Sequence, residues 1–133
     1  MEDIQALLDV TFAFVDDLLV KYGEFYPVAA AMKSDNTIVH VGTYDGNDNP
    51  STDKVLEDLK EALREGEYKA AVILFDVKVD NPATQAKTDA VAVWVESKHL
   101  EEAYHFYYPY TLNDTRELEY GESWVVNKAK EVY

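Results

Sequence analysis

Apolar residues recur at every third or fourth position near the start of the chain, the spacing that gathers side chains on one side of an α-helix. The positions concerned are Ile4, Leu7, Leu8, Thr11, Phe12, Phe14, Val15, Leu18, Leu19 and Tyr22. Charged residues such as Asp9, Asp16 and Lys21 occupy the other side. Gly23 follows, and glycine readily adopts the left-handed conformation that often ends a helix. The pattern predicts an amphipathic helix over residues 4–22 that packs on a sheet.

The next two segments, residues 25–32 and 37–44, have the composition of strands. They are joined by Ser34-Asp35-Asn36, whose short polar side chains suit a tight turn, so the sequence predicts a hairpin. In the second segment apolar residues fall on both faces, with Ile38 on one and Val39 on the other. We therefore expect that strand to be central or covered on both sides.

A polar break at residues 45–50 separates the hairpin from a second helical pattern. Either Ser51 or Thr52 can cap the helix, and Gly66 can end it. The stripe expected to be buried comprises Val55, Leu56, Leu59, Ala62 and Leu63. These signals predict a second amphipathic helix in the middle of the chain.

After Gly66 the apolar residues alternate, as they do in strands. Three such segments, at residues 68–79, 89–96 and 103–111, are separated by short polar stretches and fit a meander of three strands. The final segment, residues 118–133, fits either a sixth strand or a short closing helix. The sequence leaves both alternatives open.

These elements predict a single α+β domain over residues 1–133, with a five- or six-stranded antiparallel sheet and two main helices in the order α-β-β-α-β-β-β. The order resembles that of profilin-like and roadblock-type domains, in which helices cover a five-stranded antiparallel sheet. Folds of this type serve as scaffolds, sensors and enzymes, so the resemblance implies a fold and no activity. The chain is also similar to the small acidic proteins of bacteria that include toxin-immunity proteins.

The charge of the chain narrows the classes of partner. There are 26 acidic and 12 basic residues, which gives a formal net charge of -14. This charge repels the phosphates of nucleic acids and of anionic membranes, so we expect neither as a partner. The same negative charge speeds encounter with a protein whose surface is basic. A basic protein is therefore the partner that the sequence favours.

The lack of cysteine limits the chemistry that the chain can perform, and the first residues indicate where in the cell it is found. Without cysteine the chain has no disulfide, no thiolate nucleophile and no zinc site of the usual sulfur type. The residues Met1-Glu2-Asp3 are acidic where a secretory signal has basic residues. We expect a cytoplasmic protein.

The segment 45–53 has the acidic and amide residues of a calcium-binding loop but departs from the EF-hand pattern. Pro50 stands at the sixth position, where glycine makes the turn, and Leu56 stands at the twelfth, where a glutamate belongs. A solvated turn before a helix is the better interpretation. We expect no metal and no cofactor.

No catalytic arrangement is apparent in the sequence. The three histidines, His40, His99 and His105, form no HxH or HxxxH pair, although His40 and His105 lie on predicted strands and could approach across the sheet. None of the serines lies in a nucleophile motif, and there is no glycine-rich phosphate loop. We expect a protein that is not an enzyme.

The aromatic segment 104–110 is the strongest candidate for a contact surface, because tyrosine is enriched at binding surfaces. On a strand Tyr104, Phe106, Tyr108 and Tyr110 share one face, and His105, Tyr107 and Pro109 share the other. One face must be core, whereas the other could be exposed or buried as well. The candidate partner-binding residues are Tyr107, Tyr108 and Tyr110, together with Asp45 and Asp48.

Two functions remain from the sequence. The first is a non-catalytic acidic protein-interaction domain, such as an immunity-type inhibitor or a small scaffold. The alternative is a small-molecule sensor with a pocket between sheet and helices, near Tyr26, Tyr44 or Trp94. A homodimer formed through an edge strand is compatible with either function.

Overall fold

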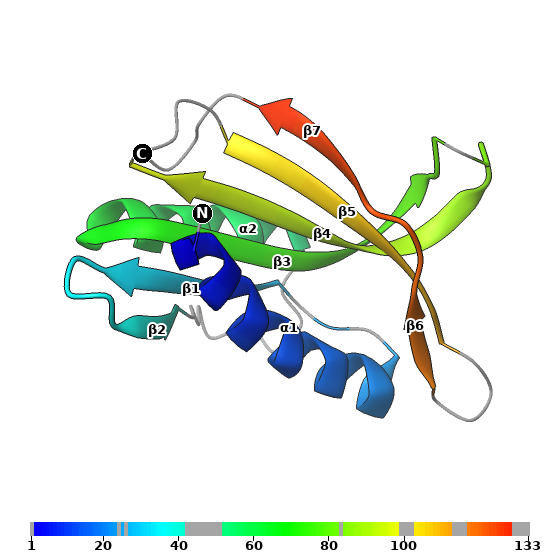
Figure 1. Cartoon of the computed structure of the whole chain (residues 1–133), viewed down its shortest axis with the longest axis horizontal. Helices are drawn as coiled ribbons and strands as arrows, with labels where there is room; N and C mark the ends of the chain where they lie inside the picture. The colour runs from blue at the N-terminus through cyan, green and yellow to red at the C-terminus, as the bar shows by residue number, and fades with distance from the viewer. Residues whose placement is uncertain are drawn as a thin grey trace.

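The structure is a computed structural model, and it describes residues 2–23, 25, 27–41, 52–82, 84–98, 103–112 and 117–128. These residues form two helices and seven strands (Figure 1). The helices are α1 (Glu2–Tyr22) and α2 (Thr52–Glu65). The strands are β1 (Val28–Lys33), β2 (Ile38–Val41), β3 (Tyr68–Asp80), β4 (Lys87–Ser97), β5 (Ala103–Leu112), β6 (Leu118–Tyr120) and β7 (Trp124–Lys128). Among the described helices, none has the length and apolar character that crossing a membrane requires.

The strands form one antiparallel sheet in the order β2-β1-β3-β4-β5, with both β6 and β7 paired to β5. The predicted α+β class and the order α-β-β-α-β-β-β are confirmed. The sheet has seven strands where five or six were expected. The difference arises in the last segment, which forms two short strands, β6 and β7, where the sequence suggested one strand or a helix.

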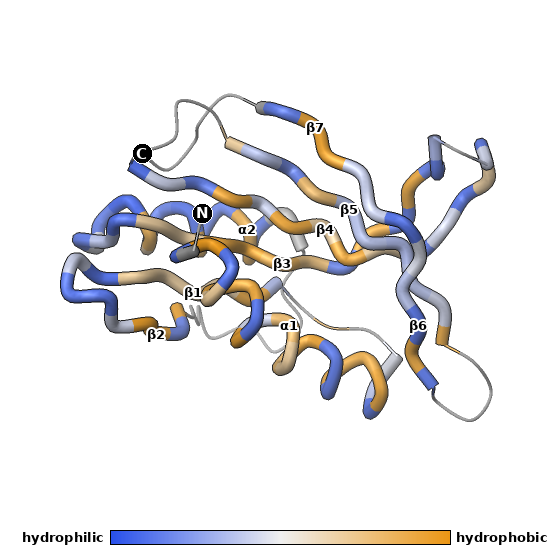
Figure 2. The backbone as a smooth tube through the Cα atoms, viewed as in Figure 1, coloured by the Kyte–Doolittle hydropathy of each residue, from blue (hydrophilic) through white to orange (hydrophobic). Residues whose placement is uncertain are grey.

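The two helices lie on opposite faces of the sheet, α1 in front and α2 behind in the view of Figure 1. Alternate residues of each strand therefore enter two separate cores, because successive side chains of a strand point to opposite faces. Under α1 the core includes Leu7, Val72 and Val93. Under α2 it includes Leu63, Ile73 and Trp94. Figure 2 shows the resulting apolar interior of the central strands β3 and β4.

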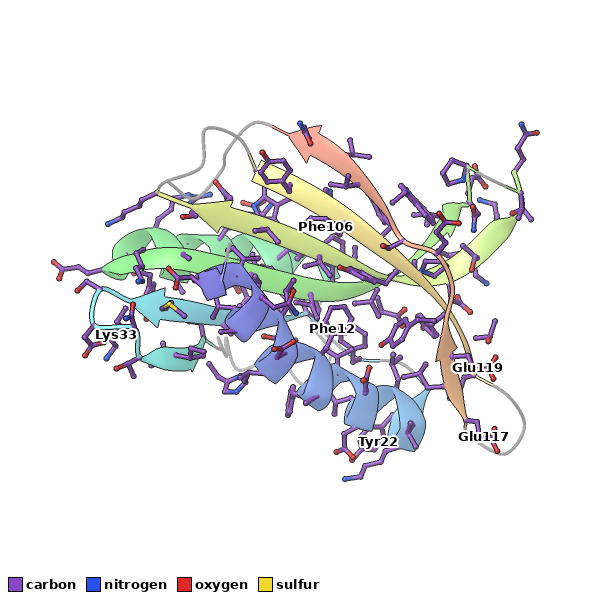
Figure 3. The ribbon with its side chains drawn as sticks, in the orientation of Figure 1. Phe12, Tyr22, Lys33, Phe106, Glu117 and Glu119 are labelled. Atoms are coloured by element: carbon purple, nitrogen blue, oxygen red, sulfur yellow. The ribbon has the colours of Figure 1, made fainter. Side chains whose placement is uncertain are left out.

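Helix α1 confirms most of the predicted stripe. Leu7, Thr11, Val15 and Leu19 are fully buried, and the Thr11 hydroxyl donates a hydrogen bond of 2.6 Å to the Leu7 carbonyl. Phe12 points toward the sheet (Figure 3). Two further residues assigned to the stripe are exposed, however, Phe14 by 47% and Tyr22 by 69%. Gly23 ends the helix as predicted, with a φ of 77° and its N–H bonded to the Leu19 carbonyl.

The hairpin of β1 and β2 closes through the predicted turn. Asn36 has a positive φ of 70°, and Asp35 accepts a 3.0 Å hydrogen bond from the Thr37 amide. Hydrogen bonding by the Thr37 side chain and then by its amide lowers the pKa of the Asp35 carboxyl. Strand β2 lies at one end of the sheet rather than in its centre. Its apolar residues still pack on both sides, Ile38 with the α1 core and Val39 with the α2 core.

Candidate functional site

The β3–β4 hairpin forms one wall of the site. The two strands pair continuously from Ala70 and Ser97 to Asp80 and Lys87, and they extend well beyond the helices. The turn that joins them is held by backbone hydrogen bonds from Asn81 to Ala86 and from Gln85 to Asn81, at 2.9 and 2.6 Å. The long hairpin thus presents its turn residues at a fixed place beside β5.

Strand β5 separates from β4 at Pro109. The last pair between them is Ala90 with Pro109, and proline has no N–H with which to continue the ladder. The following residues, Tyr110 to Leu112, pair with β6 instead. A gap therefore opens between the end of the hairpin and the far half of β5.

The chain between β6 and β7 closes the gap from the other side. Tyr120 pairs with Tyr110 and Trp124 pairs with Tyr107, so this edge carries one more residue than β5, as at a β-bulge. Gly121 donates a 2.8 Å hydrogen bond to the Pro109 carbonyl. A Cβ atom at position 121 would lie 3.3 Å from the Pro109 Cγ, so glycine permits this close approach.

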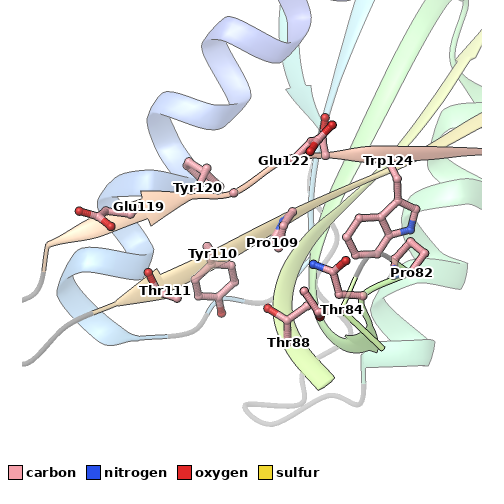
Figure 4. A pocket seen from close by; sticks show the side chains of 13 residues that line it. Pro82, Thr84, Thr88, Pro109, Tyr110, Thr111, Glu119, Tyr120, Glu122 and Trp124 are labelled. Carbon is pink, nitrogen blue, oxygen red and sulfur yellow. The ribbon is translucent and has the colours of Figure 1, made fainter. Parts of the chain in front are cut away.

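Together these elements enclose a groove of about 530 Å³ (Figure 4). It is lined by Asn81, Pro82, Thr84, Thr88, Pro109, Tyr110, Thr111, Glu119, Tyr120, Gly121, Glu122, Ser123 and Trp124. Three aromatic rings and two prolines supply its apolar surface, and hydroxyl and amide groups supply hydrogen-bonding positions. Glu119 and Glu122 are exposed, and none of the described lining residues is basic. The groove therefore combines an apolar surface with two acidic side chains.

Trp124 belongs to a row of aromatic residues that crosses the sheet on the α2 face. Its indole stacks on Tyr107, with ring centroids 5.4 Å apart. Tyr107 lies 5.0 Å from the ring of His105, which in turn lies 5.1 Å from Trp94. These contacts hold the Trp124 ring in place at the groove, since packed aromatic pairs are favourable beyond their buried area.

Two tyrosines on the other face are anchored by carboxylates. The Tyr110 hydroxyl donates a 2.7 Å hydrogen bond to Asp76, and the Tyr120 hydroxyl donates one to Asp16 of α1. Burial and the bond to Asp16 raise the pKa of Tyr120 far above the ordinary value. These bonds connect the groove to β3 and to α1, both on the α1 face of the sheet.

The structure separates the tyrosines that the sequence suggested as partner-binding residues. Tyr110 lines the groove although it is only 6% exposed, and Tyr107 supports the groove through Trp124. Tyr108 faces α1, where its ring lies 5.0 Å from that of Phe12. Asp45 and Asp48 lie outside the described residues.

Sequence reasoning missed the residues that give the groove its character, Pro82, Glu119, Glu122 and Trp124. In the sequence, Pro82 belongs to the break that follows the segment 68–79. Trp124 is the tryptophan of the final segment, 118–133. Nothing in the pattern indicated that those two segments meet, because their contact depends on where β5 leaves β4.

The histidines that the structure describes lie apart from each other. His40 faces α1 from β2, whereas His105 lies on the α2 face of β5, so these two histidines do not meet. His99 lies outside the described residues, as do Tyr26 and Tyr44 of the suggested sensor pocket. Within the described ranges no group of three histidine or acidic side chains is placed to hold a metal ion.

Comparisons with protein-family models, with curated proteins and with solved structures give no match for this chain. The groove must therefore be interpreted from its own chemistry.

The raised pKa values of the tyrosines around the groove predict that the free energy of unfolding decreases at alkaline pH. Burial raises the pKa values of Tyr107, Tyr108 and Tyr120 above 10.0, so the folded chain favours their neutral forms. The stabilisation that these tyrosines contribute is complete at pH values below the tyrosine pKa of the unfolded chain. It is lost as the pH rises from that value through their higher pKa values in the folded chain.

Urea unfolding on either side of pH 10.0 measures this effect. The dependence of the free energy of unfolding on pH should become shallower in Tyr120→Phe, because phenylalanine has no group that titrates. A free energy of unfolding that stays constant or rises above this pH would contradict the assignment.

Proposed function

We propose that this chain is a non-catalytic acidic protein-interaction domain whose groove holds an extended, basic segment of a partner protein. The observation that carries the proposal is the composition of the groove, in which Pro82, Pro109 and Trp124 lie beside Glu119 and Glu122, with no basic residue among the part of the lining that the structure describes. An immunity-type inhibitor and a small scaffold, both acting in the cytoplasm, are the roles that this activity fits.

The aromatic lining of the groove supports a peptide-like ligand. In other domains, extended proline-containing peptides dock in grooves lined by aromatic side chains. Such peptides lose little conformational entropy on binding, because they are already extended before they bind. Trp124 is the expected centre of the contact, since tryptophan is the residue most enriched among those that dominate binding energy. Thr84 accepts a hydrogen bond from the Ala86 amide and keeps its O–H as a donor for the backbone of the ligand, whereas Thr88 donates to the Asp89 carbonyl and can only accept.

The charge of the groove supports a basic ligand. Glu119 and Glu122 attract lysine and arginine side chains, and the net charge of -14 steers a basic partner toward the chain. Because exposed charges are screened by salt, the affinity should fall as the salt concentration rises.

A small-molecule ligand is the second candidate, because the groove volume of about 530 Å³ lies in the range of small-ligand sites. The two candidates differ in their dependence on charge. An uncharged small ligand should stabilise the chain to the same degree at low and high salt, whereas a basic peptide should not.

The experiment compares variants in the binding of a short proline-containing peptide rich in lysine and arginine. Trp124→Ala should weaken binding by about 30-fold, the effect of losing a dominant contact residue. Glu119→Lys with Glu122→Lys should weaken it by about 3- to 30-fold, since each exposed ion pair contributes roughly 0.2–1 kcal/mol and its reversal adds repulsion.

The matched control is Glu57→Lys with Glu61→Lys on α2. Both of these residues are exposed, lie outside the groove and change the net charge by the same amount. Equal weakening by the two double variants would show that only the overall charge attracts the peptide. Binding that is unaffected by Trp124→Ala would exclude the groove.

A further inference from the structure

The sheet is forked at the groove. Strands β4 and β5 pair with each other as far as Ala90 and Pro109. Beyond this point residues 87–89 of β4 pair with β3, and residues 110–112 of β5 pair with β6. In Figure 1 the end of the β3–β4 hairpin and the β5–β6 pair turn away from each other at the right of the view.

The fork leaves one edge of β4 open. Lys87 and Asp89 are exposed, and no described strand pairs with residues 87–89 on the side that β5 has left. A strand edge carries N–H and C=O groups that can pair with another extended chain. Thr88 of this edge lines the groove, so a ligand in the groove lies beside it (Figure 4). The groove therefore offers a backbone as well as side chains.

The two faces of the fork differ in the side chains that they offer. On the α1 face the hydroxyls of Tyr110 and Tyr120 already donate hydrogen bonds to carboxylates of β3 and α1. Glu119 pairs with Thr111, the neighbour of Tyr110, so these two side chains point to the α2 face, where Trp124 lies. Among the described residues Glu119 forms no ion pair. Its charge is therefore available to a basic ligand.

We propose that the basic segment held by the groove forms an additional β-strand beside residues 87–89 of β4, in the place that β5 leaves at Pro109. This inference rests on the proposed function and adds the way in which the ligand is recognised. Main-chain hydrogen bonds to β4 give affinity, and alternate side chains give specificity, as in other cases of strand addition. Every second side chain of the ligand points toward Trp124 and Glu119, because side chains alternate along a strand.

This binding mode has a period of two residues. Because the edges of β4 and β5 diverge, a strand that follows β4 moves away from β5. Only every second residue of such a strand directs its N–H toward β4, and the others direct it outward. Proline, which lacks the N–H, is accepted only at an outward position. A polyproline II peptide forms no such ladder and repeats every three residues.

Peptides with methylated backbone nitrogens test this period. The parent is the short lysine- and arginine-rich peptide with one central proline, and the dissociation constant is measured by titration calorimetry. Methylation of the two residues next to the proline should raise the dissociation constant at least about tenfold, because it removes N–H groups that face β4.

The matched control carries the same number of methyl groups on the residues two positions away from the proline, on either side. Their N–H groups point outward like the proline nitrogen, so the dissociation constant should change by less than about threefold. The two methylated peptides have the same side chains and the same charge. They differ only in which nitrogens are blocked.

Amide hydrogen exchange of the chain locates the bound strand. The parent peptide at saturation should slow exchange at residues 87–89, where new hydrogen bonds form. It should not slow exchange in β2 or β7, which are outer strands of the described sheet.

Equal effects of the two methylated peptides would overturn strand addition, and so would slowed exchange in β2 or β7 without a change at residues 87–89. If the parent peptide then still binds and is weakened by Trp124→Ala, the proposed function stands without this binding mode. A parent peptide that does not bind overturns both.

Discussion

Leu7→Ala and Leu63→Ala are each expected to lower the free energy of unfolding by about 2–5 kcal/mol, the cost of a cavity left by a buried leucine. Leu7 is 0% exposed under α1, and Leu63 is 1% exposed under α2. Domains of this size have a total stability of about 5–15 kcal/mol, so either change removes a large part of it. Urea unfolding monitored by circular dichroism measures the losses.

The two losses should also add in the double variant, because the clusters around Leu7 and Leu63 share no member and lie on opposite faces of the sheet. Val125→Ala, at an exposed position of β7, should change the free energy of unfolding by less than about 1 kcal/mol. A strong departure from additivity would mean that the helices do not cover separate cores.

Trp94→Phe is expected to lower the free energy of unfolding by about 2–4 kcal/mol. The Trp94 indole donates a 2.6 Å hydrogen bond to Glu96, whose side chain is fully buried. Phenylalanine cannot donate this bond, and it also leaves a cavity. The same urea experiment measures the effect.

The control is Trp124→Phe, which makes the same change in a half-exposed side chain and should cost less than about 1 kcal/mol. Glu96→Gln should cost less than Trp94→Phe, because glutamine keeps an acceptor oxygen for the indole. If Trp94→Phe and Trp124→Phe were equally mild, the buried bond to Glu96 would not contribute to stability.

The fold was largely predictable, because its elements depend on local patterns. The stripes of both helices, the positive-φ residues Asn36 and Gly23, and the alternation in β3, β4 and β5 are all signals within a few residues. The division of the aromatic strand was also predictable: Phe106 and Tyr108 pack with the α1 core, while His105 contacts Trp94 on the other face.

What the pattern could not predict depends on contacts between distant segments. Phe14 and Val15 are adjacent apolar residues of α1, yet Val15 is buried and Phe14 is 47% exposed, because the sheet covers only one side of the helix. In the same way β2 has apolar residues on both faces without being central, since both helices reach this end of the sheet.

The groove depends on such contacts most of all. Pro109 interrupts the pairing of β5 with β4, and the bulge at Gly121 brings Trp124 next to the β3–β4 turn. A proline within an aromatic strand does signal a break in the ladder. The sequence does not show which segments fill the space beyond it, so Glu119 and Glu122 could not be recognised as site residues.

The most direct measurement is a map of amide and indole NMR shifts as the lysine- and arginine-rich proline peptide is added. The largest changes should occur at the Trp124 indole, Thr84, Thr111 and Ser123, and a peptide with glutamate in place of its basic residues should cause none. Changes centred on α1 or α2, or equal responses to both peptides, would contradict binding of a basic segment in the groove.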